Sequence, residues 1–70
     1  MTEEFRLTAS IYTLPATIRA ADAFKHLCRV RVLPANDETW VTLEVGEHQA
    51  NVIDEFLNYA LALSAQELLS

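Results

Sequence analysis

The side chains best suited to metal or nucleophile chemistry are His26, Cys28 and His48, the chain's two histidines and its one cysteine. Three such ligands could form an open zinc site. Neither of the usual ligand spacings, CxxC or HxxxH, occurs. Cysteine is also often simply buried, and Cys28 falls on the apolar side of an alternating segment. We therefore expect no metal, no cofactor and no catalytic thiol.

The acidic residues and the single glycine do not form another catalytic pattern. Asp54 and Glu55 are adjacent, so they would lie about 100° apart on a helix rather than in one site. Asp22 and Glu67 are interpreted as single charges on helix surfaces. One glycine cannot form a glycine-rich phosphate loop. The sequence therefore predicts a protein that is not an enzyme.

The spacing of apolar residues predicts the element order β-α-β-β-α. Apolar and polar residues alternate in three segments, which is typical of half-buried strands. Two other segments have helical spacing, and Thr13 can cap the first of them ahead of Pro15. The predicted elements are strands at 5–12, 28–33 and 39–45, a helix from 14 to 27 and a helix from about 49 to 69.

A right-handed crossover makes the first two strands parallel and lets the third insert antiparallel between them. We therefore predict a single α+β domain over residues 1–70, with a three-stranded antiparallel sheet in order 1-3-2 and two helices on one face. This is a ferredoxin-like arrangement without its last strand. Ala9 and Ile11 are expected to face the helices. The edge of strand 5–12 stays unpaired, and no Pro or Lys blocks another chain from pairing there.

Size and composition favour a partner. The chain has 70 residues, 51% of them hydrophobic, and a formal net charge of −5. A chain this short without a disulfide or a metal usually needs a very apolar core or an oligomer. The acidic N-terminus differs from a signal peptide, and no stretch is long enough to span a bilayer. We expect a cytoplasmic protein that binds neither membranes nor, given its charge, nucleic acid.

The last helix carries more apolar residues than one sheet can cover. One stripe can face its own sheet, and a second stripe is predicted to contact a partner protein or a second copy of the chain. Asn58 lies between the stripes and is either a surface residue or a buried amide that fixes register. The predicted partner interface is Val52, Phe56, Tyr59 and Leu63.

The uncovered face of the predicted sheet allows an alternative function. Arginines and aromatic residues alternate on it, as they do where RNA-binding sheets stack bases. Arg29, Arg31 and Trp40 are the candidate ligand-binding or RNA-binding residues, and Tyr12 is expected on the same face. Cross-strand pairing with Glu44 and cation–π contacts account for the same residues without a ligand.

Three segments resemble a known family. The run YTLPATIRAA at 12–21, with Phe24 and the strand CRVRV at 28–32, resembles the opening of the small HxsD-type proteins. These are accessory proteins of His-Xaa-Ser peptide-maturation systems, encoded with radical SAM enzymes. EFLNY at 55–59 resembles the family's Leu-Leu-Asn helix motif, with Asn58 on the motif's asparagine. The family usually continues with charged residues, whereas 59–64 here is uncharged. The resemblance implies a non-catalytic accessory protein with a radical SAM enzyme as partner.

Overall fold

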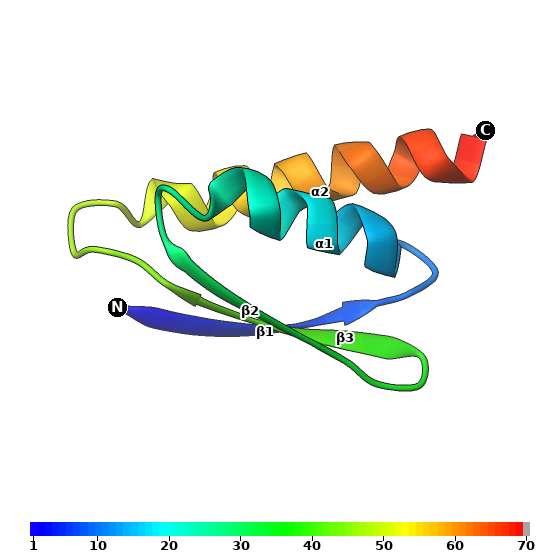
Figure 1. Cartoon of the computed structure of the whole chain (residues 1–70), viewed down its shortest axis with the longest axis horizontal. Helices are drawn as coiled ribbons and strands as arrows, with labels where there is room; N and C mark the ends of the chain where they lie inside the picture. Colours follow the sequence, from blue (N-terminus) through cyan, green and yellow to red (C-terminus); the bar gives the residue numbers. More distant parts are fainter. Residues whose placement is uncertain (70) are drawn as a thin grey trace.

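The structure is a computed structural model that describes residues 1–69, and its elements follow the predicted order (Figure 1). Each strand is short and each is bounded by a turn or a helix. The elements are β1 (Thr2–Thr8), α1 (Leu14–Phe24), β2 (Arg29–Pro34), β3 (Glu38–Glu44) and α2 (Asn51–Leu69).

The three strands form an open sheet in the order β1-β3-β2, and β3 is antiparallel to both neighbours. Val41 in the central strand lies opposite Phe5 on one side and Val32 on the other. Both helices cover the same face of the sheet (Figure 1). The predicted α+β fold is therefore confirmed, with β1 and β2 as the two sheet edges.

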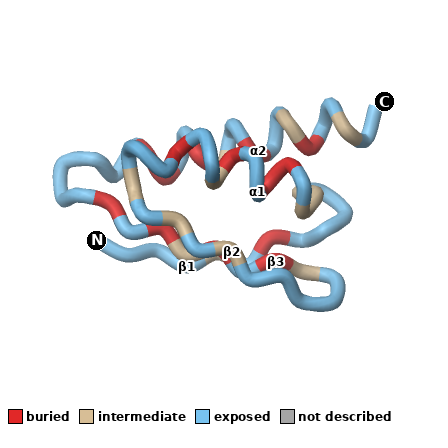
Figure 2. The backbone as a smooth tube through the Cα atoms, viewed as in Figure 1, coloured by how far each residue is buried: buried red, intermediate tan, exposed pale blue. Residues whose placement is uncertain are grey.

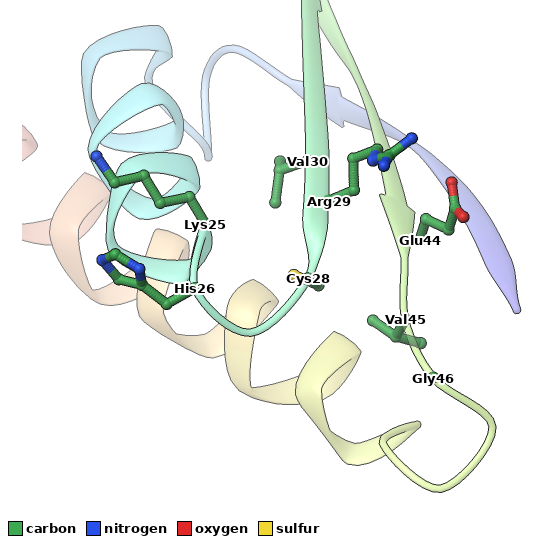
Figure 3. A pocket seen from close by; sticks show the side chains of 8 residues that line it. All are labelled: Lys25, His26, Cys28, Arg29, Val30, Glu44, Val45 and Gly46. Atoms are coloured by element: carbon green, nitrogen blue, oxygen red, sulfur yellow. The ribbon is translucent and has the colours of Figure 1, made fainter.

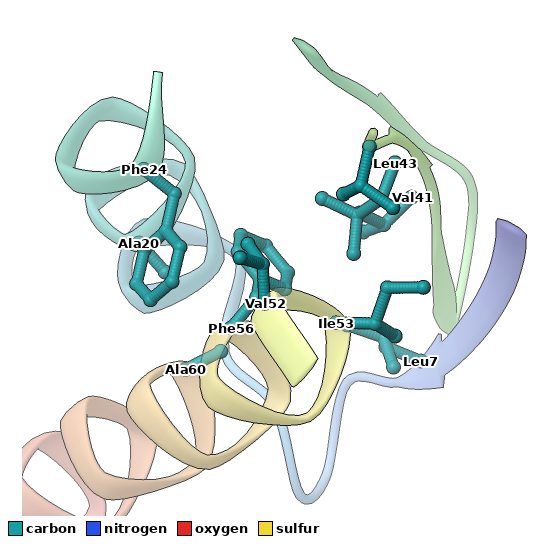
Figure 4. Packing of buried hydrophobic residues seen from close by; sticks show 10 residues of the cluster. Leu7, Ala20, Phe24, Val41, Leu43, Val52, Ile53, Phe56 and Ala60 are labelled. Atoms are coloured by element: carbon teal, nitrogen blue, oxygen red, sulfur yellow. The ribbon is translucent and has the colours of Figure 1, made fainter. Parts of the chain in front are cut away.

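The buried core lies between the helix layer and the sheet (Figures 2 and 4). Val41 and Leu43 of β3 are fully buried, and Phe56 of α2 is packed among them and the helices. The ring of Phe24 in α1 meets the ring of Phe56 edge-on, with centroids 5.5 Å apart. Ile53 of α2 points toward Leu7 (Figure 4), so α2 lies over the β1 side of the sheet.

Strand β1 begins three residues earlier than predicted and ends at Thr8 rather than Tyr12. The pairing with β3 ends where the N–H of Ala9 donates to the carbonyl of Asp37, beside the β2–β3 turn. The N–H groups of Ile11 and Tyr12 then both donate to the carbonyl of Thr8, which turns the chain toward α1. Ala9 and Ile11 are consequently exposed, and Tyr12 packs against the core instead of lying on the open face.

Other element ends also differ from the prediction by one to three residues. Helix α1 ends at Phe24 rather than Leu27, because the N–H groups of Leu27 and Cys28 both donate to the Phe24 carbonyl and turn the chain into β2. Strand β2 accordingly starts one residue late, at Arg29. Helix α2 begins at Asn51, after a turn at residues 46–50.

Thr13 links the two helices. Its hydroxyl caps α1 by accepting a bond from the Ala16 N–H at 3.3 Å, as predicted. The same hydroxyl donates to Oε2 of Glu67 at 2.5 Å, and the Thr13 N–H donates to Oγ of Ser64 at 3.0 Å. Ser64 is fully buried. These bonds fix the C-terminal half of α2 against the start of α1.

Candidate interaction surface

Helix α2 carries an exposed apolar stripe in its C-terminal half. Leu61, Ala65 and Leu68 are spaced i, i+4 and i+7, so they lie along one side of the helix. All three are exposed, with exposed fractions of 41% for Leu61 and 59% for Leu68. We call these three residues the outer stripe. They lie well around the helix from Phe56, so neither α1 nor the sheet covers them.

The predicted partner interface is largely internal. Val52 and Phe56 have exposed fractions of 6% and 0%, so they belong to the chain's own core rather than to a surface open to a partner. Tyr59 remains 42% exposed, but its ring packs against Phe24 with centroids 5.6 Å apart. Leu63 is half-buried. Helix α1 covers the side of α2 that was predicted to contact another chain.

Asn58 is exposed on α2. The interpretation of this residue as a buried amide that fixes register is therefore wrong, and the surface interpretation holds. Asn58 precedes Leu61 by three residues and Ala65 by seven, so it lies on the same side of α2 as the outer stripe.

The uncovered sheet face keeps the two arginines of the predicted ligand site together but places Trp40 apart from Arg29. Arg29 lies opposite Glu44 and Arg31 opposite Thr42, beside a depression of about 450 Å³. Along β3, Trp40 lies four residues from Glu44, about 13 Å of strand away from the position of Arg29, but only two residues from Thr42, so Arg31 is its diagonal neighbour. Instead of the two arginines of β2, Trp40 has the guanidinium of Arg6 5.6 Å from its ring centroid.

The charges on this face are balanced. Nε of Arg6 lies 3.6 Å from Oε1 of Glu38, and both side chains are exposed. Strand alternation places three arginines and three glutamates on the same face, so it has no net positive charge to attract phosphates. The residues are Arg6, Arg29 and Arg31, and Glu4, Glu38 and Glu44.

A second depression, of about 670 Å³, opens where α1 turns into β2 (Figure 3). The side chains of Lys25 and His26 extend away from those of Arg29 and Glu44, so the charged groups do not converge (Figure 3). Nζ of Lys25 pairs with Asp22 at 3.1 Å. The lining residues are Lys25, His26, Cys28, Arg29, Val30, Glu44, Val45 and Gly46.

The thiol of Cys28 is not activated as a nucleophile. Its Sγ donates to the carbonyl of Phe24 at 3.6 Å, and burial raises the pKa of the thiol above its ordinary value. A raised pKa keeps the less reactive protonated form at neutral pH. His48 does not line the depression with His26 and Cys28. Within residues 1–69 no group of three or more His, Cys, Asp or Glu is placed to hold a metal ion.

Comparison of the chain with protein-family models, with curated proteins and with solved structures found no match. In the part of the chain that the structure describes, neither helix is long and apolar enough to cross a membrane.

Proposed function

We propose that the chain is a non-catalytic interaction protein that contacts a partner protein through the outer stripe of α2. The observation that carries this proposal is the exposure of Leu61, Ala65 and Leu68 along one side of a helix. Single exposed apolar residues are normal on protein surfaces. A row at i, i+4 and i+7 is the pattern by which a helix occupies an apolar groove of another protein.

The hydrogen bonds around Thr13 support the same proposal. Ser64 and Glu67 alternate with the outer stripe along α2, and both are hydrogen-bonded to Thr13 at the start of α1. The stripe is therefore presented on a helix whose position is already fixed. A surface that is ordered before binding loses less conformational entropy when a partner docks.

The resemblance to HxsD-type proteins suggests the class of partner, a radical SAM enzyme of a peptide-modification system. In this role the chain is an accessory subunit. The uncharged run at 59–64 includes Leu61 of the outer stripe, at a place where the family usually has charged residues. We therefore expect the partner to present an apolar groove here rather than a charged surface.

Co-purification tests this proposal. The genes beside the one that encodes the chain are examined first, and a radical SAM enzyme encoded there is co-expressed with the tagged chain. We expect the enzyme to co-purify, and Leu61→Asp to reduce its recovery about tenfold or more because a charge enters an apolar contact. Ala62→Asp is the matched control, since Ala62 is exposed one position further around the same helix.

Two results would overturn the proposal. If no radical SAM enzyme is encoded nearby, or if the enzyme does not co-purify, the accessory role fails. If Leu61→Asp and Ala62→Asp both retain the enzyme as the unchanged chain does, the outer stripe is not the contact surface. Circular dichroism of both variants checks that the substitution at the exposed position has left α2 folded.

A further inference from the structure

The free edge of β1 presents backbone groups that the register identifies. In an antiparallel pair, alternate residues bond to the partner strand and those between them point outward. The Met1 ammonium donates to the Val45 carbonyl at 2.9 Å, and the Val45 N–H donates to the Met1 carbonyl at 2.8 Å. Odd-numbered residues therefore bond to β3. The residues whose N–H and carbonyl groups point away from β3 are Thr2, Glu4, Arg6 and Thr8.

Most of these outward groups lack a partner. The carbonyl of Thr8 accepts bonds from the N–H groups of Ile11 and Tyr12. The backbone groups of Thr2, Glu4 and Arg6 have no hydrogen-bond partner within residues 1–69. A row of unpaired groups on an edge strand is a template for a strand from another chain, unless Pro, Lys or a bulge blocks it. Strand β1 contains neither Pro nor Lys.

The two edge strands, β1 and β2, differ in charge, and the difference shows which of them can pair with a second copy of itself. Strand β2 carries Arg29 and Arg31 and no acidic residue, so two copies of β2 would bring only like charges together. Its last residue, Pro34, also has no N–H to donate. Strand β1 carries both signs of charge on neighbouring outward positions, Glu4 and Arg6. Two copies of β1 can therefore place opposite charges across from each other, whereas two copies of β2 cannot.

We propose that the chain forms a twofold-symmetric dimer in which β1 pairs antiparallel with β1 of a second copy, with Phe5 on the twofold axis. Glu4 of each chain then lies opposite Arg6 of the other, and these residues exchange backbone hydrogen bonds. The two three-stranded sheets become one sheet of six strands. This inference goes beyond the proposed function, because it uses the sheet edge and not the outer stripe.

The register follows from the charges. The outward groups can also pair with the axis on Glu4 or on Arg6. An axis on Glu4 places two glutamates opposite each other, and an axis on Arg6 does the same with two arginines. Like charges directly opposite destabilise a strand pair, whereas opposite charges stabilise it. An axis on Phe5 gives two Glu–Arg pairs on the open face.

On the face of the sheet that the helices cover, the apolar side chains near the β1 edge are compatible with the same twofold axis. Phe5 faces the helices and is only half-buried, so the axis pairs two aromatic rings. Helix α2 lies over the β1 side, and Leu57, one turn after Ile53, is also half-buried. The twofold rotation places the copy of α2 on the same face of the joined sheet. One rotation thus pairs the β1 edge and brings Phe5 against its copy.

Charge exchange between two variants tests this dimer. In a dimer of Arg6→Glu, the glutamates at positions 4 and 6 of the two copies lie opposite each other. In a dimer of Glu4→Arg, the arginines at these positions lie opposite each other. We expect sedimentation equilibrium to show that each variant alone dimerises about tenfold or more weakly than the unchanged chain. An equal mixture of the two variants restores both Glu–Arg pairs, so the mixture should dimerise about as tightly as the unchanged chain.

Mixing also controls for folding. Arg6→Glu loses the ion pair with Glu38 and the contact with Trp40, but the mixture contains the same damaged chain. Recovery in the mixture therefore reports the pairing and not the stability of either variant. Amide exchange gives a second measurement, in which the N–H groups of Glu4 and Arg6 are protected only in the dimer.

Three results would overturn the proposal. The first is a monomer at every concentration tested, which would mean that the β1 edge does not pair with a second copy and is available only to a different protein. The second is a dimer that neither variant weakens or that mixing does not restore, since its contacts would lie elsewhere. The third is a dimer in which the N–H groups of Glu4 and Arg6 exchange as fast as those in the exposed turns.

Discussion

Ser64 shows how one small polar residue positions a helix. Its Oγ donates to the carbonyl of Ala60 at 2.8 Å and accepts the N–H of Thr13 at 3.0 Å, so both hydrogen-bonding roles of the hydroxyl are used. Thr17 does something similar in α1, where its hydroxyl donates to the Thr13 carbonyl at 2.8 Å. Both residues are fully buried. Their polar groups are buried at little cost because each is satisfied locally.

Replacing Ser64 with alanine should destabilise the fold. Ser64→Ala leaves the N–H of Thr13 without its partner in a part-buried place, at a cost of about 1–3 kcal/mol. For a chain of this length each kcal/mol lowers Tm by about 4–8 °C. Thermal unfolding followed by circular dichroism measures the change. Ser10→Ala, at an exposed turn, is the control and should stay within about 0.5 kcal/mol. Equal Tm values for the two variants would contradict this role of Ser64.

At the scale of elements, periodicity predicted which segments fold into helices and strands but not how far each extends. The alternation from Phe5 to Tyr12 is a local property, whereas the length of β1 depends on its partner. Strand β3 starts at Glu38, so residues after Ala9 have nothing left to pair with. The sheet order was predictable because the handedness of the crossover leaves few alternatives.

The two stripes of α2 show the same limit for the candidate site. Helical spacing identified both apolar stripes, but it could not show that Phe24 of α1 packs against Phe56. The stripe assigned to a partner is thus partly core, whereas Leu61 and Leu68, which lie outside that stripe, are exposed. The balanced charge of the open sheet face likewise required the register, since Glu4 and Glu38 join that face only through pairing.

Phe56 separates a core role from an interface role. The side chain is fully buried and meets Phe24 edge-on, so Phe56→Ala should cost about 3–5 kcal/mol. That is a large part of the total stability of a small domain. Urea unfolding should show a much lower midpoint than for Leu61→Ala, which removes an exposed side chain of similar apolar character. A Phe56→Ala chain that stays as stable as the unchanged one and loses only its association would restore the interface interpretation.

At the scale of the whole molecule, the size of the chain limits its stability. Seventy residues without a disulfide enclose one small core, and the open face and both edges of the sheet remain uncovered. Pairing between copies through β1 adds contacts only in the folded state. Folding and association are then linked, because an assembly that binds the folded form stabilises it by mass action.

The melting temperature should therefore rise with protein concentration. A hundredfold increase in concentration stabilises a dimer by about 2.7 kcal/mol, or about 1.4 kcal/mol per chain, which corresponds to about 6–11 °C in Tm for this length. Calorimetry over that range measures the slope. Arg6→Glu alone, with glutamates of both copies opposed at the edge, should show a smaller rise in Tm over the same range, because weaker pairing leaves more of the chain monomeric at the lower concentrations. A concentration-independent Tm for the unchanged chain would show instead that the small core suffices without a second copy.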